Sequence, residues 1–82
     1  MILVEVYVAV INEVYDFQLE ENAAVEQVME EIIGMVGKKL KSIIENSNRD
    51  FLLCCVERGE ILPREKTLAD CKVKDGSHLL LV

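Results

Sequence analysis

The chain begins with two stretches in which apolar and polar side chains alternate. Over residues 2–10, Glu5 marks one face as the wetter one, and the opposite face carries Ile2, Val4, Val6 and Val8. Successive side chains of a strand point to opposite sides of a sheet, so this pattern predicts a strand whose valines face inward. A polar turn at Asn12-Glu13 leads to a second alternating run over 14–20, with Tyr15, Phe17 and Leu19 inward. Together the two runs predict a β-hairpin.

A helix is predicted next, because the apolar spacing changes to three and four residues. Its apolar stripe consists of Val25, Val28, Met29, Ile32 and Val36, with Leu40 as a candidate continuation. Asn22 is the expected N-cap, and the early glutamates and late lysines suit the helix dipole, so one helix is expected from residue 23 to the low forties. Gly34 and Gly37 each cost about 1 kcal/mol inside a helix. A break near Gly37 followed by a second short helix therefore remains the alternative.

The last third of the chain reads as short strands separated by turns. The run 51–57 is apolar, and we expect it to be a strand buried on most of both sides. A turn at Arg58-Gly59, a very short strand at 61–62 that Pro63 ends, and a helical turn at 67–70 follow. After a turn at Asp75-Gly76, residues 78–82 form the closing strand, with Leu79 and Leu81 on one face. We expect a two-layer α+β fold in which the first and last strands pair in parallel at the sheet centre.

Composition limits the kind of partner that the protein binds. The chain has 82 residues, which is the size of a single domain (1–82), and a formal net charge of −6. Such an acidic balance argues against nucleic acid and against anionic membranes. No Lys/Arg cluster offers an exception, since Lys38, Lys39 and Lys41 read as the charged end of a helix. No targeting or membrane-spanning segment is recognised, so we expect a cytoplasmic protein with three reduced cysteines and no membrane insertion.

The segment EILPREKTLADCKVKDGSHLLLV resembles ubiquitin, and so does the order of predicted elements. The resemblance rests on a glycine turn, a leucine on a short strand, a Thr-Leu-x-Asp turn, a buried valine, a polar turn and an alternating last strand. These features fall at Gly59, Leu62, Thr67-Leu68-Ala69-Asp70, Val73, Asp75-Gly76 and Leu79/Leu81. The resemblance implies a ubiquitin-like β-grasp fold, with a mixed four- to five-stranded sheet and one main helix packed on one face. Residues from about 34 to 50 do not match.

Among ubiquitin-like proteins, the chain is most similar to the small bacterial proteins of the YukD/EsaB type. They share the small size, the acidic balance, the Asp-Gly turn before the last strand and an end at or near that strand. The resemblance implies an accessory component of a type VII (ESX-like) secretion system, with a protein of that system as its partner.

Covalent or cofactor chemistry finds little support in the sequence. Conjugation and sulfur transfer both need a free tail ending in Gly-Gly, and the sequence ends Leu79-Leu80-Leu81-Val82, so a modifier or sulfur carrier would require processing. There is no C-x-x-C for a metal or iron–sulfur site, and Cys54 and Cys55 point to opposite faces. A redox role for Cys54 is the minor alternative. His78 has no partner acid evident in the sequence. We therefore expect no enzymatic activity, no cofactor and no metal.

The remaining candidate site is the face of the sheet that the helix does not cover. If the predicted register holds, this face carries Val56, His78, Leu80 and Val82. Ubiquitin-like domains bind partners through this face, and an exposed aliphatic patch on a small protein usually marks an interaction surface. Partner binding is the preferred reading. The alternatives are aliphatic residues that only decorate an edge, or a patch that closes a homodimer.

Overall fold

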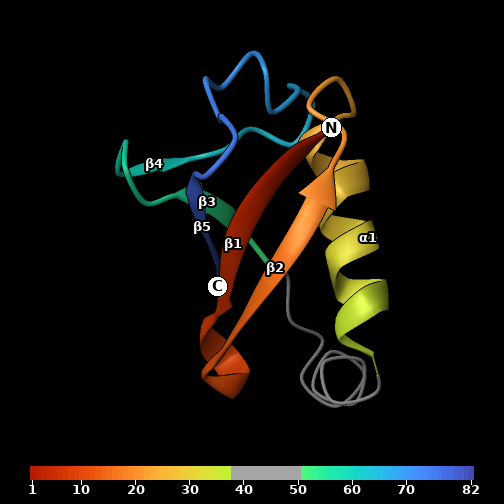
Figure 1. The fold of residues 1–82 in the computed structure, drawn as a ribbon, viewed down its shortest axis with the longest axis vertical. Coiled ribbons are helices and arrows are strands. Elements are labelled where there is room, and N and C mark those ends of the chain that lie inside the picture. Colours follow the sequence, from red (N-terminus) through yellow and green to blue (C-terminus); the bar gives the residue numbers. More distant parts are fainter. Residues whose placement is uncertain (38–50) are drawn as a thin grey trace.

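A five-stranded mixed sheet carries one helix on one face (Figure 1). The fold is described from a computed structural model that defines residues 1–37 and 51–82. Across the sheet the strand order is β2-β1-β5-β3-β4. The elements are β1 (Ile2–Val8), the 3-10 helix η1 (Ala9–Ile11), β2 (Glu13–Leu19), α1 (Val25–Val36), β3 (Leu53–Cys55), β4 (Glu60–Ile61) and β5 (His78–Leu81). This arrangement confirms the predicted β-grasp architecture.

The first and last strands pair in parallel, as predicted, and they form the middle of the sheet. Val6 lies opposite Leu79 and Val8 opposite Leu81. All four side chains are almost completely buried. β5 therefore has a neighbour on each side, because β3 pairs with its other edge in antiparallel fashion.

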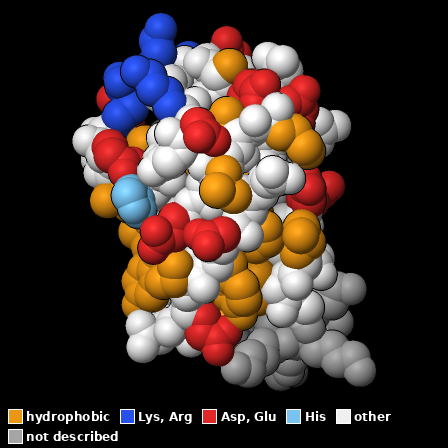
Figure 2. Space-filling model, in the orientation of Figure 1, with side chains coloured by type: hydrophobic (Ala, Val, Ile, Leu, Met, Phe, Trp, Pro, Cys, Tyr) orange, Lys and Arg blue, Asp and Glu red, His pale blue; other side chains and the backbone are white. Residues whose placement is uncertain are grey.

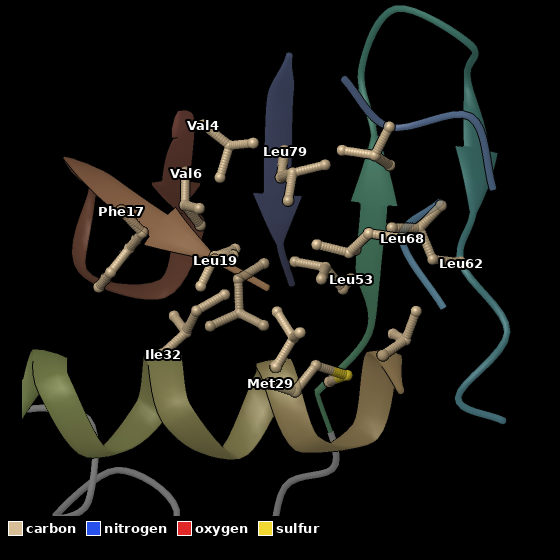
Figure 3. Close-up of a cluster of buried hydrophobic side chains, with 14 of the residues drawn as sticks. Val4, Val6, Phe17, Leu19, Met29, Ile32, Leu53, Leu62, Leu68 and Leu79 are labelled. Carbon is tan, nitrogen blue, oxygen red and sulfur yellow. The ribbon is translucent and has the colours of Figure 1, made fainter. Parts of the chain in front are cut away.

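The core lies between the sheet and α1 and is almost entirely aliphatic (Figure 3). From the sheet, side chains such as Val4, Leu19, Leu53 and Leu79 point toward the helix. From α1, the buried residues are Val25, Val28, Met29 and Ile32, which is the predicted stripe without its last member. Val36 is only partly buried, as is Tyr15 on β2.

Helix α1 begins later than predicted, and the expected cap is wrong. Ala24 is the N-cap, with no side-chain cap, and Asn22 lies outside the helix. The first two helical N–H groups are bound by a distant loop instead. Val25 donates to the carbonyl of Lys66 at 2.7 Å, and Glu26 donates to that of Arg64 at 3.0 Å. A capping side chain is unnecessary because tertiary structure satisfies these donors.

The helix ends at Val36, with Gly37 as its C-cap at φ +84°. Glycine adopts this left-handed region without steric cost, which explains the end of the helix at this point. The expected continuous helix to the low forties is therefore wrong, and the predicted break near Gly37 is correct. Whether a second helix follows, over 37–48, concerns residues outside the described part of the chain.

The hairpin turn and β3 also differ from expectation. β1 stops at Val8, and a 3-10 turn ends on Asn12, which has a left-handed backbone at φ 52°. β3 spans three residues, where 51–57 was predicted, and it is fully buried on one side only. Leu53 and Cys55 are buried, whereas Cys54 between them is partly exposed and Leu52, just before the strand, is 42% exposed. The helix covers a single face of the sheet, so alternate side chains of the apolar run stay at the surface.

The loop before the last strand contains the predicted helical turn, in which the Cys71 N–H donates to the carbonyl of Thr67 at 3.2 Å, and side-chain hydrogen bonds fix its start. Thr67 and Asp70 bond reciprocally, with the Asp70 N–H donating to Thr67 Oγ1 at 3.0 Å and the Thr67 N–H donating to Asp70 Oδ2 at 3.3 Å. This turn places Leu68 in the core, as predicted, and Val73 beside it. At the next turn the Leu3 N–H donates to Asp75 Oδ1 at 2.7 Å, so the loop also anchors the start of β1.

Candidate protein-interaction site on the open face of the sheet

A row of apolar side chains crosses all five strands on the face of the sheet opposite α1. Neighbouring members are paired in register, Val14 with Tyr7, Tyr7 with Leu80, Leu80 with Cys54, and Cys54 with Ile61. Side chains in register lie on the same side of a sheet, about 4.5–5.5 Å apart at Cβ. We call Val14, Tyr7, Leu80, Cys54 and Ile61 the apolar row. Val14 is 53% exposed and Ile61 59% exposed, so both ends of the row are open to solvent.

The structure places the four residues predicted for this face together on it. Leu80 is at the centre of the apolar row and is half-buried. Val82 continues along the same side of β5, and its N–H and C=O both bond to Leu52, at 2.9 and 2.7 Å. Val56 follows β3, is 55% exposed, and donates its N–H to the carbonyl of His78 at 2.9 Å.

A second, charged row runs beside the apolar one. Asp16 is in register with Glu5, and Glu5 is in register with His78. Like charges directly opposite one another on a sheet destabilise it. The His78 ring relieves part of this repulsion, with Nε2 3.5 Å from the Glu5 carboxylate. Figure 2 shows the histidine with acidic side chains and apolar side chains close by.

His78 has two acidic partners, contrary to the expectation that it has none. Its Nδ1 contacts Glu57 Oε2, and its backbone N–H donates to the two carboxylate oxygens of Glu57 at 2.9 and 3.1 Å. These hydrogen bonds lower the pKa of Glu57 to about 2. The same carboxylate raises the pKa of His78 above its ordinary value of 6.5. The contact therefore favours the charged form of each side chain over that of the isolated group.

Sequence reasoning missed several members of this site. Tyr7, Val14, Leu52 and Ile61 are exposed apolar residues on the open face and were not selected. The signal for Tyr7 and Val14 was present, since both occupy outward positions of alternating strands. Because Glu5 lies on the same face, the outward positions were interpreted as polar, and the apolar residues beside Glu5 were not recognised. Glu57 had no signal, because its contact with His78 joins residues 21 positions apart.

The three cysteines are free thiols with different surroundings. Cys55 is buried in the core and Cys54 lies half-buried on the opposite face, as the alternation predicted. Burial raises the pKa of the Cys54 thiol, and it raises that of Cys71 although the charge of Lys66 acts in the other direction. A raised pKa reduces the thiolate fraction, which is the reactive form. These surroundings do not favour a redox role for Cys54.

Cofactor and metal chemistry gain no site from the described residues. Over 1–37 and 51–82, no group of three His, Cys, Asp or Glu side chains is arranged to hold a metal ion. Within the same ranges, no helix has the length and apolar character needed to cross a membrane.

Basic side chains do gather at one end of the molecule, which corrects the expectation that no Lys/Arg cluster exists outside residues 38–41. Arg58, Lys66 and Lys72 line one hollow of about 510 Å³. Arg58, Lys72 and Lys74 line a neighbouring one of about 350 Å³. In Figure 2 this basic end appears as the group of blue side chains at the top of the molecule.

Comparison with solved structures defines the class of fold as ubiquitin-like. The EccD5 ubiquitin-like domain from Mycobacterium xenopi superposes with a TM-score of 0.76 at 22% identity, covering 99% of this chain and 91% of that one. The N-terminal ubiquitin-like domain of the 4931431F19Rik protein gives 0.73 at 22% identity, with 99% and 72% covered. A designed protein based on ubiquitin gives 0.74 at 14% identity, with 99% and 85% covered. At these identities the likeness shows the fold alone.

The family is shown by sequence. The family model for YukD, a protein of the WXG100 protein secretion system (Wss), matches residues 3–81. The chain therefore belongs to the YukD family of the WXG100 (type VII) secretion system. No curated protein sequence matches it.

Proposed function

We propose that this chain is a non-catalytic protein-binding module of the WXG100 secretion apparatus, and that it docks a protein of that apparatus on the open face of its sheet. The observation that carries the proposal is the apolar row, which crosses five strands without interruption. Removing apolar surface from water is favourable by about 25 cal/mol per Å², and this gain opposes the entropic cost of association. The row thus supplies a driving force for docking that the folded monomer leaves unused.

The charged row beside it specifies the partner further. Glu5 and Asp16 face one another, and no Lys or Arg of the described residues forms an ion pair with either. A partner with basic side chains next to an apolar patch relieves this repulsion on binding. Such complementarity contributes mainly to specificity and to the rate of association. We therefore expect the partner surface to be apolar at its centre and basic along one side.

The buried position of β5 argues against a role of its residues in covalent attachment to another protein. Leu79 and Leu81 are buried, and Val82 is paired with Leu52 through both of its backbone groups. Withdrawing these residues from the sheet would expose two core leucines, at a cost of about 1.5–3 kcal/mol for each side chain. The competing reading, a modifier or sulfur carrier made competent by processing, predicts a covalent adduct. Intact mass after incubation in cell extract tests this point, and an adduct at the C-terminus would contradict the binding-module reading.

Docking is tested with purified components of the WXG100 system encoded by the same genome, titrated singly against the chain by calorimetry. We expect one component to bind and the double variant V56S/L80A to bind it at least about tenfold more weakly, which equals 1.4 kcal/mol. M35S is the matched control, since Met35 is an exposed apolar residue on α1, away from the sheet face. Absence of any binding component, or equal affinity of V56S/L80A and the native chain, would refute the proposal.

Self-association is the other use of the same face, and sedimentation equilibrium distinguishes it. A dimer of the native chain that V56S/L80A converts to monomer would assign the open face to a second copy instead. We expect the native chain and both variants to sediment as monomers.

A further inference from the structure

Charge is divided unevenly along the described chain. All of its Lys and Arg side chains fall between residues 58 and 74, and they are Arg58, Arg64, Lys66, Lys72 and Lys74. Residues 1–37 contain no Lys or Arg and eight acidic residues, namely Glu5, Glu13, Asp16, Glu20, Glu21, Glu26, Glu30 and Glu31. The fold then concentrates the basic residues at one end, where two hollows open side by side.

The two hollows are neighbours, because Arg58 and Lys72 line both of them. The larger hollow, of about 510 Å³, falls within the size range of ligand pockets, which is about 300–1,000 Å³. Its wall is partly apolar, formed by Ile61, Leu62 and Pro63. The larger hollow thus combines positive charge with apolar contact surface.

Three of these cations have no ion-pair partner among the described residues. Arg58 pairs with Glu60 at 3.4 Å, and Arg64 donates to the carbonyl of Phe51 at 2.7 Å, so both are engaged in the fold. Over 1–37 and 51–82, no carboxylate lies within ion-pair distance of the ammonium of Lys66, Lys72 or Lys74. These ammonium groups are available to an external anion.

Lys72 occupies an unusual backbone position for a lysine. Its φ is +64°, in the left-handed region that glycine and asparagine favour. The flanking turn holds it there through the Lys72 N–H to Ala69 carbonyl bond at 3.1 Å and the Val73 N–H to Leu68 carbonyl bond at 3.0 Å. A lysine in a strained position that lines both hollows is the kind of outlier that accompanies binding sites.

We infer that this basic end binds a carboxylate-rich segment of a protein partner. Glu60 and Asp70 also line the larger hollow. Their negative charges repel a compact dianion or a nucleic-acid backbone more strongly than they repel carboxylates that are spaced along a peptide. Lysines act as flexible point charges, which suits carboxylates spaced along a peptide. Ile61 is both an end of the apolar row and part of the hollow wall. The choice of a protein segment rests on the proposed function. A partner that covers the apolar row reaches Ile61, and from there it can extend into the larger hollow at the basic end.

The test uses a fluorescein-labelled peptide of leucine and glutamate, and a matched peptide with glutamine in place of glutamate. By fluorescence anisotropy at low salt, we expect the acidic peptide to bind the native chain and the glutamine peptide to bind at least about tenfold more weakly. K66Q/K72Q should lose at least about tenfold in affinity for the acidic peptide. Q18E/M35E is the matched control, because it changes the net charge equally at exposed positions outside the hollows and should stay within about twofold.

Each contrary outcome is informative. Equal binding by K66Q/K72Q and the native chain overturns the inference, and so does an equal loss in Q18E/M35E, which would show an effect of net charge alone. Displacement of the peptide by inorganic phosphate, or tighter binding of a single-stranded oligonucleotide, would overturn the choice of a protein segment. V56S/L80A should bind the acidic peptide as the native chain does, so failure of the open-face proposal and failure of this inference are distinguishable. Thermal unfolding of each variant, followed by circular dichroism, verifies that it is folded.

Discussion

Glu57 accepts hydrogen bonds from both the backbone N–H and the ring of His78. Glu57 follows the end of β3 and His78 is the first residue of β5, so one carboxylate fastens two neighbouring strands where their pairing begins. The contact also fixes the histidine ring toward Glu5 on β1. Three strands of the open face therefore meet at this ring, next to the apolar row.

The protonation of His78 should depend on Glu57. Because the carboxylate stabilises the imidazolium, we expect the pKa of His78 to lie above 6.5 in the native chain and to fall in E57Q. An NMR titration of the His78 ring protons measures this directly. E60Q is the matched control, since it removes an exposed carboxylate that pairs with Arg58 instead. Equal pKa values in the native chain and E57Q would contradict the contact.

The Glu57–His78 pair should stabilise the fold only within a limited range of pH. The depressed pKa of Glu57 contributes stability that is present above its ordinary value of 4.5 and is lost as the pH falls toward about 2. The raised pKa of His78 contributes stability that is present below 6.5 and is lost as the pH rises through the folded value. The stability difference between the native chain and E57Q should be largest between pH 4.5 and 6.5. Urea unfolding across the pH range measures it, and a pH-independent difference would refute the assignment.

Adjacent leucines on β3 and just before it should differ sharply in their contribution to stability. Leu53 is fully buried against α1, whereas the side chain of Leu52 lies on the open face and is 42% exposed. L53A leaves a cavity in the core and should cost about 2–5 kcal/mol. L52A should change the free energy of unfolding by no more than about 0.5 kcal/mol. Chemical denaturation of both variants provides the comparison, and similar costs would mean that the helix does not cover the face assigned to it.

The Thr67–Asp70 turn should stabilise the fold through its hydrogen bonds rather than through side-chain volume. T67V removes the acceptor of the Asp70 N–H and should cost about 1 kcal/mol, in the manner of a lost helix cap. T67S keeps the hydroxyl and is the control, with an expected change of a few tenths of a kcal/mol. The two midpoints of urea unfolding decide the question. Equal destabilisation by both variants would indicate that the Thr67 methyl group matters as much as its hydroxyl.

Lys72 should lower the stability of the fold through its left-handed backbone while its ammonium group contributes to binding. Asparagine tolerates a left-handed backbone better than lysine does, so K72N should raise the free energy of unfolding by up to about 1 kcal/mol. The same change removes one ammonium from both hollows and should weaken binding of the acidic peptide. K74N removes a neighbouring charge at an ordinary backbone position and should not stabilise the chain. A destabilised K72N would show that the Lys72 side chain contributes to the fold itself.

The fold was predictable because it depends on the local alternation of apolar and polar residues and on the order of core and turn residues along the last third of the chain. The valines of β1, the stripe on α1, and Leu68, Leu79 and Leu81 are buried as their spacing indicates. Element ends were less predictable, and the physical reason is visible at α1. The helix begins at Val25 because carbonyls of residues 64 and 66 satisfy its first N–H groups. No local pattern around Asn22 reveals that partner.

The candidate sites divide in the same way. Alternation alone placed Val56, Leu80, Val82 and His78 on one face, because residues two apart on a strand share a side. It did not show that Val14 and Ile61 complete a row, since strand order and register join residues 47 positions apart in sequence. The contact of Glu57 with His78 likewise forms only when β3 pairs with β5.

The sequence by itself determined which side chains face inward, because hydrophobic burial acts on the period of each strand and helix. It also determined the family, through core and turn residues that have few alternatives in this fold. Tertiary structure alone decided which surface residues become neighbours. Basic residues scattered over 58–74 gather around two hollows, and outward apolar residues from five strands align into one row. Such neighbourhoods depend on strand order and loop path, which residue spacing along the chain does not specify.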